Sequence, residues 1–167
     1  MIIKRILLEW VTYVKYLKLN EFIKLYSMDL YKTIEYLVNF CYSECPRSIE
    51  LYDNYAGMNL EEIVKNFIQK AKGFEDLHFF EVKEGNDLVG YFAITNKFDL
   101  PMLWTFFTRP KYRKTELLWN EIEKVLTGKF YAGVYSSNIP AKKYLERHGG
   151  KLLETEDTKH SFFLFER

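Results

Sequence analysis

The segment 138–149 constrains the fold of this chain more than any other stretch. It follows an apolar run at 130–135, which is typical of a buried strand, and a second apolar run comes directly after it. Within the segment, Ala141 and Tyr144 lie three residues apart, so they share one face of a short helix, and Gly149 provides a stop. The order strand, helix, strand predicts a mixed α/β domain.

The size and charge of the chain exclude several classes of protein. Its 167 residues, 48% of them apolar, are enough for one domain with a buried core. A formal net charge of +1 provides no overall attraction to nucleic acid or to an anionic membrane. Cys41 and Cys45 share a face of an expected helix, so we expect no disulfide framework and a reducing compartment. His78, His148 and His160 lack the spacing of metal ligands.

The first nineteen residues are rich in apolar and aromatic side chains, but five charged residues interrupt them. This interruption argues against a signal peptide and against a membrane span. We expect an amphipathic helix whose apolar stripe is Ile3, Ile6, Leu7, Trp10, Val14 and Leu17. The helix could pack on its own domain or dock on a partner protein, and a strand at 2–8 is a further alternative.

Hydrophobic periodicity and turn residues predict the remaining elements. A capping-box pattern, Asn59 with Glu62, marks the start of one helix, and the turn at 83–87 has the composition of a hairpin. We expect helices at 30–44, 60–72, 117–126 and 141–147, and strands at 22–26, 77–82, 88–95, 102–108, 130–136, 151–154 and 160–165.

This order of elements, together with the 138–149 segment, resembles the GNAT superfamily of acetyl-CoA-dependent N-acyltransferases. The resemblance covers residues 22–167 and implies a GNAT-like mixed central sheet flanked by helices, an α/β (α+β) fold. Residues 1–21 would be an extra N-terminal amphipathic helical extension. Within the superfamily the chain is most similar to small acetyltransferase-like virion proteins of short-tailed bacteriophages, in the pair Tyr144-Leu145 and in the aromatic final strand 162–165.

The resemblance also implies a place for acetyl-CoA. GNAT enzymes hold its pyrophosphate on backbone N–H groups at the start of the central helix, where small residues leave space. Here the lead 110–113 is intact, but Glu116 and Leu118 occupy the two small-residue positions. Glu116 brings a carboxylate towards the phosphates, and the basic residues at 109–114 could offset part of its charge. If acetyl-CoA binds, the expected contacts are Phe107, Arg113, Lys114, Thr115, Asn138 and Ala141.

The catalytic positions of the family are also altered. GNAT enzymes protonate the leaving thiolate with a Tyr in the last helix, and that position is Leu145 here, with Tyr144 one residue early and ~100° around the helix. The strand at 102–108 has no carboxylate to deprotonate an amine. Tyr144, His78 and Glu81 are the candidates for acid–base roles.

Two hypotheses follow. The first is a non-catalytic GNAT-fold protein without a cofactor, which binds other proteins, such as phage structural proteins, through residues 1–19 and its aromatic surfaces. The second is an active acetyl-CoA-dependent N-acetyltransferase that modifies a host protein or a small amine. Either protein would be found in the host cytoplasm or in the phage virion, and would not be secreted.

Overall fold

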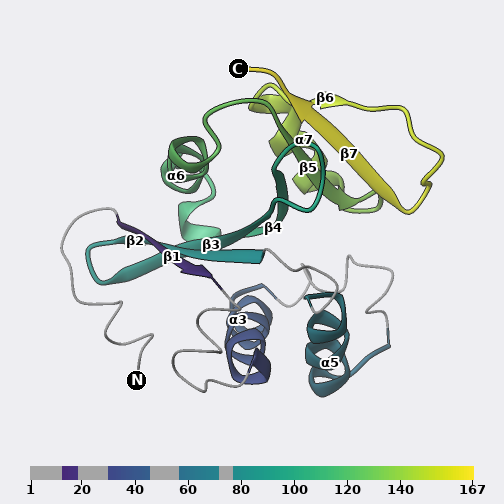
Figure 1. Ribbon diagram of the computed structural model, residues 1–167. Helices are drawn as coiled ribbons and strands as arrows, with labels where there is room; N and C mark the ends of the chain where they lie inside the picture. The colour runs from purple at the N-terminus through teal and green to yellow at the C-terminus, as the bar shows by residue number, and fades with distance from the viewer. Residues whose placement is uncertain (1–12, 19–29, 46–56, 72–76) are drawn as a thin grey trace.

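The computed structural model describes residues 13–18, 30–45, 57–71 and 77–167 (Figure 1). Within them, one sheet of seven strands carries the fold, in the order β1-β2-β3-β4-β5-β7-β6. Neighbouring strands are antiparallel except for β4 and β5, which are parallel. The strands are β1 (Tyr13–Lys18), β2 (Leu77–Glu84), β3 (Asp87–Thr95), β4 (Met102–Thr108), β5 (Phe130–Tyr135), β6 (Lys151–Leu152) and β7 (His160–Phe165).

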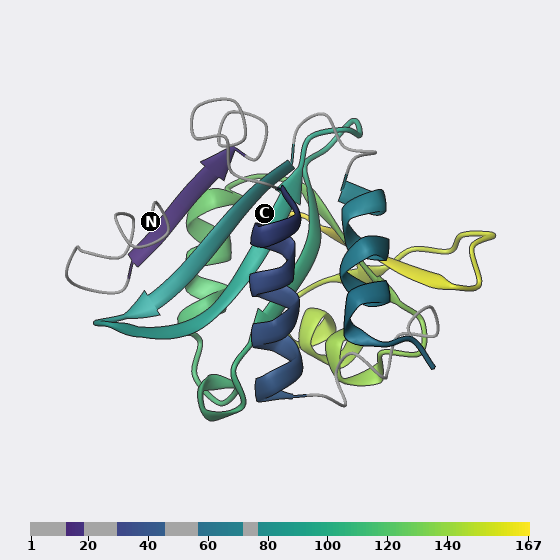
Figure 2. The ribbon, with the colours of Figure 1, turned by 90° about the horizontal axis from the view of Figure 1, so that it is seen from below.

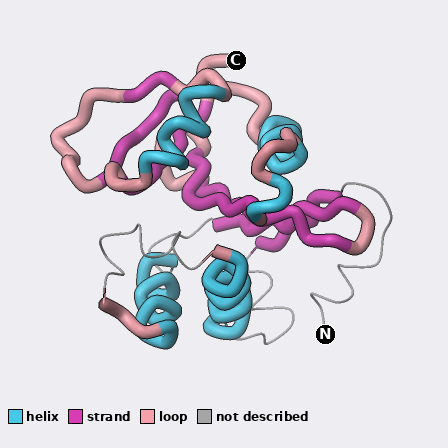
Figure 3. Tube along the Cα trace, turned by 180° about the vertical axis from the view of Figure 1, so that it is seen from behind, coloured by secondary structure: helices cyan, strands magenta, loops and turns pink. Residues whose placement is uncertain are grey.

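Helices cover both faces of this sheet. Helices α3 (Leu30–Glu44) and α5 (Leu60–Ala71) lie on one face, as Figure 2 shows from below. Helices α6 (Leu117–Val125) and α7 (Ile139–Arg147) lie on the other, and the view from behind in Figure 3 shows the same three layers. A short 3-10 turn, η2 (Pro110–Tyr112), connects β4 to α6. The expected mixed sheet flanked by helices is therefore confirmed.

Each face of the sheet has its own buried core, because side chains alternate between the faces along every strand. The core under α6 and α7 includes Phe92, Leu103, Ile122 and Phe163, each fully buried. The core under α3 and α5 is built from a second set of buried side chains: Val38, Cys41, Ile63, Val64, Leu77, Phe79, Tyr91, Ala93 and Phe107.

Strands β4 and β5 separate along their length, which is the feature that positions the site. Their parallel pairing comprises only Met102 with Tyr131 and Leu103 with Ala132. On the other side of β4, Ile94 pairs with Leu103 whereas Ala93 pairs with Thr105, so Trp104 is an extra residue in the strand. A bulge of this kind bends a strand and raises its twist. The bulge lies just where β4 leaves β5.

The expected N-terminal helix is wrong for residues 13–18, which form the edge strand β1. This strand pairs antiparallel with β2 from Tyr13 opposite Lys83 to Lys18 opposite His78. Aromatic and β-branched residues are common in this segment, and they favour strands over helices when a sheet edge offers hydrogen bonds. The rest of the predicted extension, 1–12 and 19–21, and the predicted strand at 22–26 lie outside the described residues.

Candidate functional site

A cleft opens between the splayed strands β4 and β5, with a volume of about 260 Å³. Its walls come from both faces of the sheet, because α5 contributes from one side and the start of α7 from the other (Figure 1). The lining residues are Phe67, Lys70, Phe98, Met102, Trp104, Thr105, Phe106, Gly133, Val134, Tyr135, Asn138, Ala141, His160 and Phe162.

Polar groups of the cleft gather around Tyr135 at the end of β5. Lys70 on α5 donates a hydrogen bond from its ammonium to the Tyr135 hydroxyl. The ring of His160 packs on the Tyr135 ring, with 4.9 Å between the centroids, and its Nδ1 lies 2.9 Å from a carboxylate oxygen of Asp157. Asn138 follows β5 and caps α7, since its side-chain oxygen accepts a hydrogen bond from the Ala141 amide at 3.3 Å.

The residue at the start of α6, where the resemblance places the pyrophosphate, carries a carboxylate. Glu116 is the N-cap residue of this helix, yet its side chain makes no cap hydrogen bond to the helix. It reaches instead to His148 at the end of α7, where Glu116 Oε2 lies 2.5 Å from His148 Nε2. The other ring nitrogen of His148 lies 2.8 Å from the Tyr144 carbonyl. This contact links the beginning of α6 to the end of α7.

Aromatic rings fill the space between α6 and α7 above β4. Tyr144 stacks on Phe106 of β4 with 5.5 Å between the ring centroids, and it meets Trp119 of α6 edge-on at 5.7 Å. His148 packs on both Tyr144 and Trp119, at 4.4 and 4.3 Å. Burial raises the pKa of Tyr144 well above its ordinary value, and the negative charge of Glu116 raises it further. The ring of Tyr144 is therefore part of the packing between α6 and α7.

The two leucines at altered family positions are core residues. Leu145 is fully buried and Leu118 is 1% exposed, both within the core under α6 and α7. The expected obstruction of the pyrophosphate by Leu118 is therefore wrong, since its side chain points into the core and away from the start of the helix. Glu116 alone places a side chain at that position.

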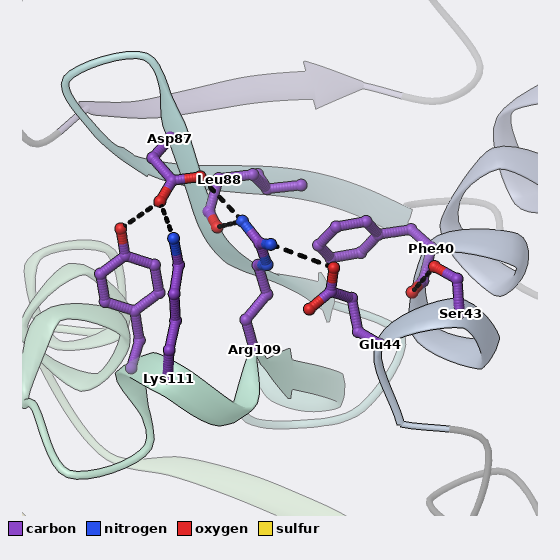
Figure 4. Close-up of polar contacts among 8 residues, drawn as sticks. Phe40, Ser43, Glu44, Asp87, Leu88, Arg109 and Lys111 are labelled. Carbon is purple, nitrogen blue, oxygen red and sulfur yellow. Dashed lines mark hydrogen bonds and ion pairs between the residues drawn. The ribbon is translucent and has the colours of Figure 1, made fainter.

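Arg109 and Lys111, two of the basic residues before α6, bond to carboxylates other than that of Glu116. Figure 4 shows Arg109 between Asp87 and Glu44, at 2.7 Å and 3.0 Å. Lys111 also bonds to Asp87, and the Tyr112 hydroxyl donates to the same carboxylate at 2.5 Å. These bonds, those from Lys111 and Tyr112 above all, lower the pKa of Asp87 to about 2. Arg109 and Lys111 thus neutralise carboxylates of β3 and α3, and little of their charge is directed to Glu116.

The structure brings together only part of the predicted site. Of the expected cofactor contacts, Asn138 and Ala141 line the cleft. Phe107 is buried on the opposite face, edge-on to Phe40 with 5.8 Å between the centroids. Arg113, Lys114 and Thr115 are exposed in the turn before α6: Arg113 Nε donates to the Thr108 carbonyl at 3.3 Å, and Thr115 Oγ1 donates to the Tyr112 carbonyl at 2.7 Å.

The predicted catalytic candidates lie apart from one another. His78 and Glu81 are both on β2, with β3 between that strand and β4. They point to opposite faces of the sheet, because they are three residues apart in a strand. Neither of them is among the lining residues of the cleft, and Tyr144 lies between α6 and α7.

Sequence reasoning missed the polar end of the cleft. Lys70 and Tyr135 are 65 residues apart in sequence, and no local pattern pairs them. His160 was noted only as an isolated histidine. The sequence does contain a partial indication that Lys70 faces the sheet. Lys70 follows one helical turn after Phe67, on the same helix as the buried residues Ile63 and Val64. Among the described residues, no group of three His, Cys, Asp or Glu side chains could hold a metal ion.

Acetyl-CoA fits these residues poorly at two points. A phosphate at the start of α6 would meet the Glu116 carboxylate, and like charges ~4 Å apart in a partly solvated site repel by on the order of 4 kcal/mol. The space between α6 and α7, next to the start of α6, is filled by the rings of Tyr144, Trp119 and His148. The cleft between β4 and β5 is open, but its continuation towards the start of α6 is packed.

Solved structures share the fold of most of the chain. An acetyltransferase from Thermus thermophilus matches with a TM-score of 0.67 at 17% identity, over 95% of this chain and 100% of that one. The Campylobacter jejuni N-acetyltransferase PseH, in complex with acetyl coenzyme A, matches with a TM-score of 0.53 at 15% identity, over 93% and 99%.

A third match is the acetyltransferase from Salmonella typhimurium that modifies the N-terminal serine of ribosomal protein L7/L12, with a TM-score of 0.55 at 9% identity, over 92% and 95%. At these identities the likeness establishes the fold alone. Comparisons with protein-family models and with curated proteins found no match. The chain therefore has the fold of the GNAT acetyltransferases. None of the helices in its described part has the length and apolar character needed to cross a membrane.

Proposed function

We propose that this chain is a GNAT-fold protein that acts by binding and does not transfer acetyl groups. One observation carries the proposal: Glu116 and His148 join the start of α6 to the end of α7 at the point where a pyrophosphate would bind. Tyr144 supports it, because its ring is packed between the helices and its pKa is raised. Leu145 is at the position of the usual proton donor, and its hydrocarbon side chain has no acidic proton to donate.

A gain-of-binding variant tests this proposal. Glu116→Gly removes the carboxylate and restores the small residue at the start of α6, whereas Glu116→Gln keeps the bulk and removes only the charge. We expect acetyl-CoA to bind Glu116→Gly at least tenfold more tightly than the unmodified protein in calorimetric titration, with Glu116→Gln between them. Leu118 is left unchanged, because Leu118→Gly would open a cavity in the core. Equal affinity of all three proteins would show that Glu116 does not control the site.

The partner we propose is a structural protein of a phage particle. Support comes from the sequence likeness to phage virion proteins and from the aromatic residues of the N-terminal segment. Since β1 is part of the sheet, deletion of residues 1–19 would remove an edge strand. Deletion of residues 2–12 is the sharper test, and we expect it to reduce co-purification with the particle while leaving thermal melting unchanged. A deleted protein that still assembles normally would argue against this docking role.

A second candidate function is acetyl-CoA-dependent transfer to a host protein or a small amine. The open cleft favours it, because β4 and β5 diverge after Leu103 and Ala132 and leave access from both faces of the sheet. This function requires the Glu116–His148 contact to open when the cofactor binds. Acetylation of an added amine by the unmodified protein would establish it.

A further inference from the structure

The cleft between β4 and β5 has a positively charged group and no negative one among its described lining residues. Lys70 contributes the charge, and its ammonium lies against Tyr135 both through the hydroxyl and over the ring, at 5.2 Å from the ring centroid. Asp157 bonds to His160 but lies outside the lining. The Lys70 ammonium itself attracts an anion that enters the cleft and repels a cation.

Aromatic side chains make up much of the lining of the cleft. Trp104 packs edge-on against Phe67 of α5, with 6.1 Å between the centroids, and Phe106 lies on the other side of the bulged strand. Aromatic rings of this kind bind planar apolar groups by stacking and edge contacts. A volume of about 260 Å³ lies just below the ~300–1,000 Å³ of pockets for drug-sized ligands, so the cleft is suited to a smaller molecule.

We propose that this cleft binds a small planar carboxylate, with the apolar body against Trp104 and Phe67 and the carboxylate on Lys70 and Tyr135. An ammonium has three N–H donors, so a ligand carboxylate can share Lys70 with the acceptors it already has. The inference rests on the proposed function, since it names the ligand class of a binding protein. It differs from the needs of an acetyltransferase, whose acceptor is an amine and would be repelled by Lys70 when protonated.

Two probes with the same ring and opposite charge test the ligand class. Indole-3-acetate and tryptamine are each titrated into the full chain by calorimetry at pH 7. We expect indole-3-acetate to bind with one-to-one stoichiometry and a Kd below about 1 mM, and tryptamine to bind at least tenfold more weakly. This comparison needs no variant, so it does not depend on how a substitution folds. Equal or tighter binding of tryptamine would overturn the proposal, as would the absence of saturable indole-3-acetate binding up to about 10 mM.

A charge-removing variant then tests the role of Lys70. Lys70→Met keeps the apolar stem, and we expect it to weaken indole-3-acetate binding roughly tenfold and to strengthen tryptamine binding, because the repulsion of the ammonium is removed. Lys65→Met is the matched control, because Lys65 is on the same helix, exposed, and paired with Glu61 at 2.6 Å. Unchanged indole-3-acetate affinity in a folded Lys70→Met protein would overturn the inference. Acetyl-CoA titration reports separately on the proposed function, so a failure of one proposal is distinguishable from a failure of the other.

Discussion

Glu116 stands at a position where the resemblance to GNAT enzymes leads us to expect a small residue. The first backbone N–H groups of a helix attract anions, and GNAT enzymes use them for a pyrophosphate. In this chain the residue at that position carries its own carboxylate, which is held 2.5 Å from His148. The N-cap residue of α6 therefore supplies an anion of the protein's own, the Glu116 carboxylate.

Tyr144 provides a prediction at the same scale. Its contacts with Phe106, Trp119 and His148 are contacts of the ring. We therefore expect Tyr144→Phe to change the free energy of unfolding by less than about 0.5 kcal/mol, and Tyr144→Ala to lower it by about 3 kcal/mol. Denaturant unfolding of the two variants measures the difference. A Tyr144→Phe protein as unstable as Tyr144→Ala would show that the hydroxyl matters more than the ring.

Part of the site at this scale was predictable from the sequence. Spacing from Asn138 placed Leu145 at the usual acid position, and alignment on the 110–113 lead placed Glu116 at the pyrophosphate loop. The direction of Leu118 was not predictable from a motif, because the packing of the whole helix decides which side chain points to the core. Lys70 was missed because its partner Tyr135 is distant in sequence.

At the scale of elements, one network joins α3, the β2–β3 hairpin and the turn before α6. Arg109 bonds to Glu44 at the end of α3 and to Asp87 and the Leu88 carbonyl at the start of β3. Lys111 in η2 donates a further hydrogen bond to Asp87 (Figure 4). The network fixes the end of β4, and through it the position of the α6 start.

Asp87 gives this network a dependence on pH. Its pKa in the folded protein is about 2, below the ~3.9 of an unfolded chain. Asp87 therefore stabilises the fold above about pH 4, and this contribution is lost as the pH falls from about 4 to about 2. We expect Asp87→Asn to be less stable than the unmodified protein at pH 7, with the difference shrinking at pH 3 in denaturant unfolding. The Asp87 side chain is 40% exposed, so screening keeps the effect modest, and added salt should reduce it. A difference that grows on acidification would contradict this assignment.

The elements themselves were mostly predictable, and β1 shows the limit. Apolar spacing predicts helices at 30–44 and 60–72, and the structure has helices at Leu30–Glu44 and Leu60–Ala71. Residues 13–18 have apolar side chains that fit a helical stripe, but they also suit a strand. The edge of β2, more than fifty residues away in sequence, pairs with residues 13–18 and so selects the strand over the helix. Local periodicity cannot show such a partner.

At the scale of the whole molecule, the cleft between β4 and β5 and the region between α6 and α7 differ in how far side chains fill them. The cleft between β4 and β5 is open, with Lys70, Tyr135 and His160 at one end. The region between α6 and α7 is closed by aromatic packing and by the Glu116–His148 contact. The described residues thus leave a pocket between β4 and β5, while aromatic rings pack the space between α6 and α7.

Calorimetric titration of the unmodified full chain with acetyl-CoA tests the central claim most directly. The carboxylate at the start of α6 and the packed rings beside it predict no saturable heat up to about 1 mM acetyl-CoA. Binding in the micromolar range, with one molecule per chain, would contradict this account and would place the acetyltransferase function first.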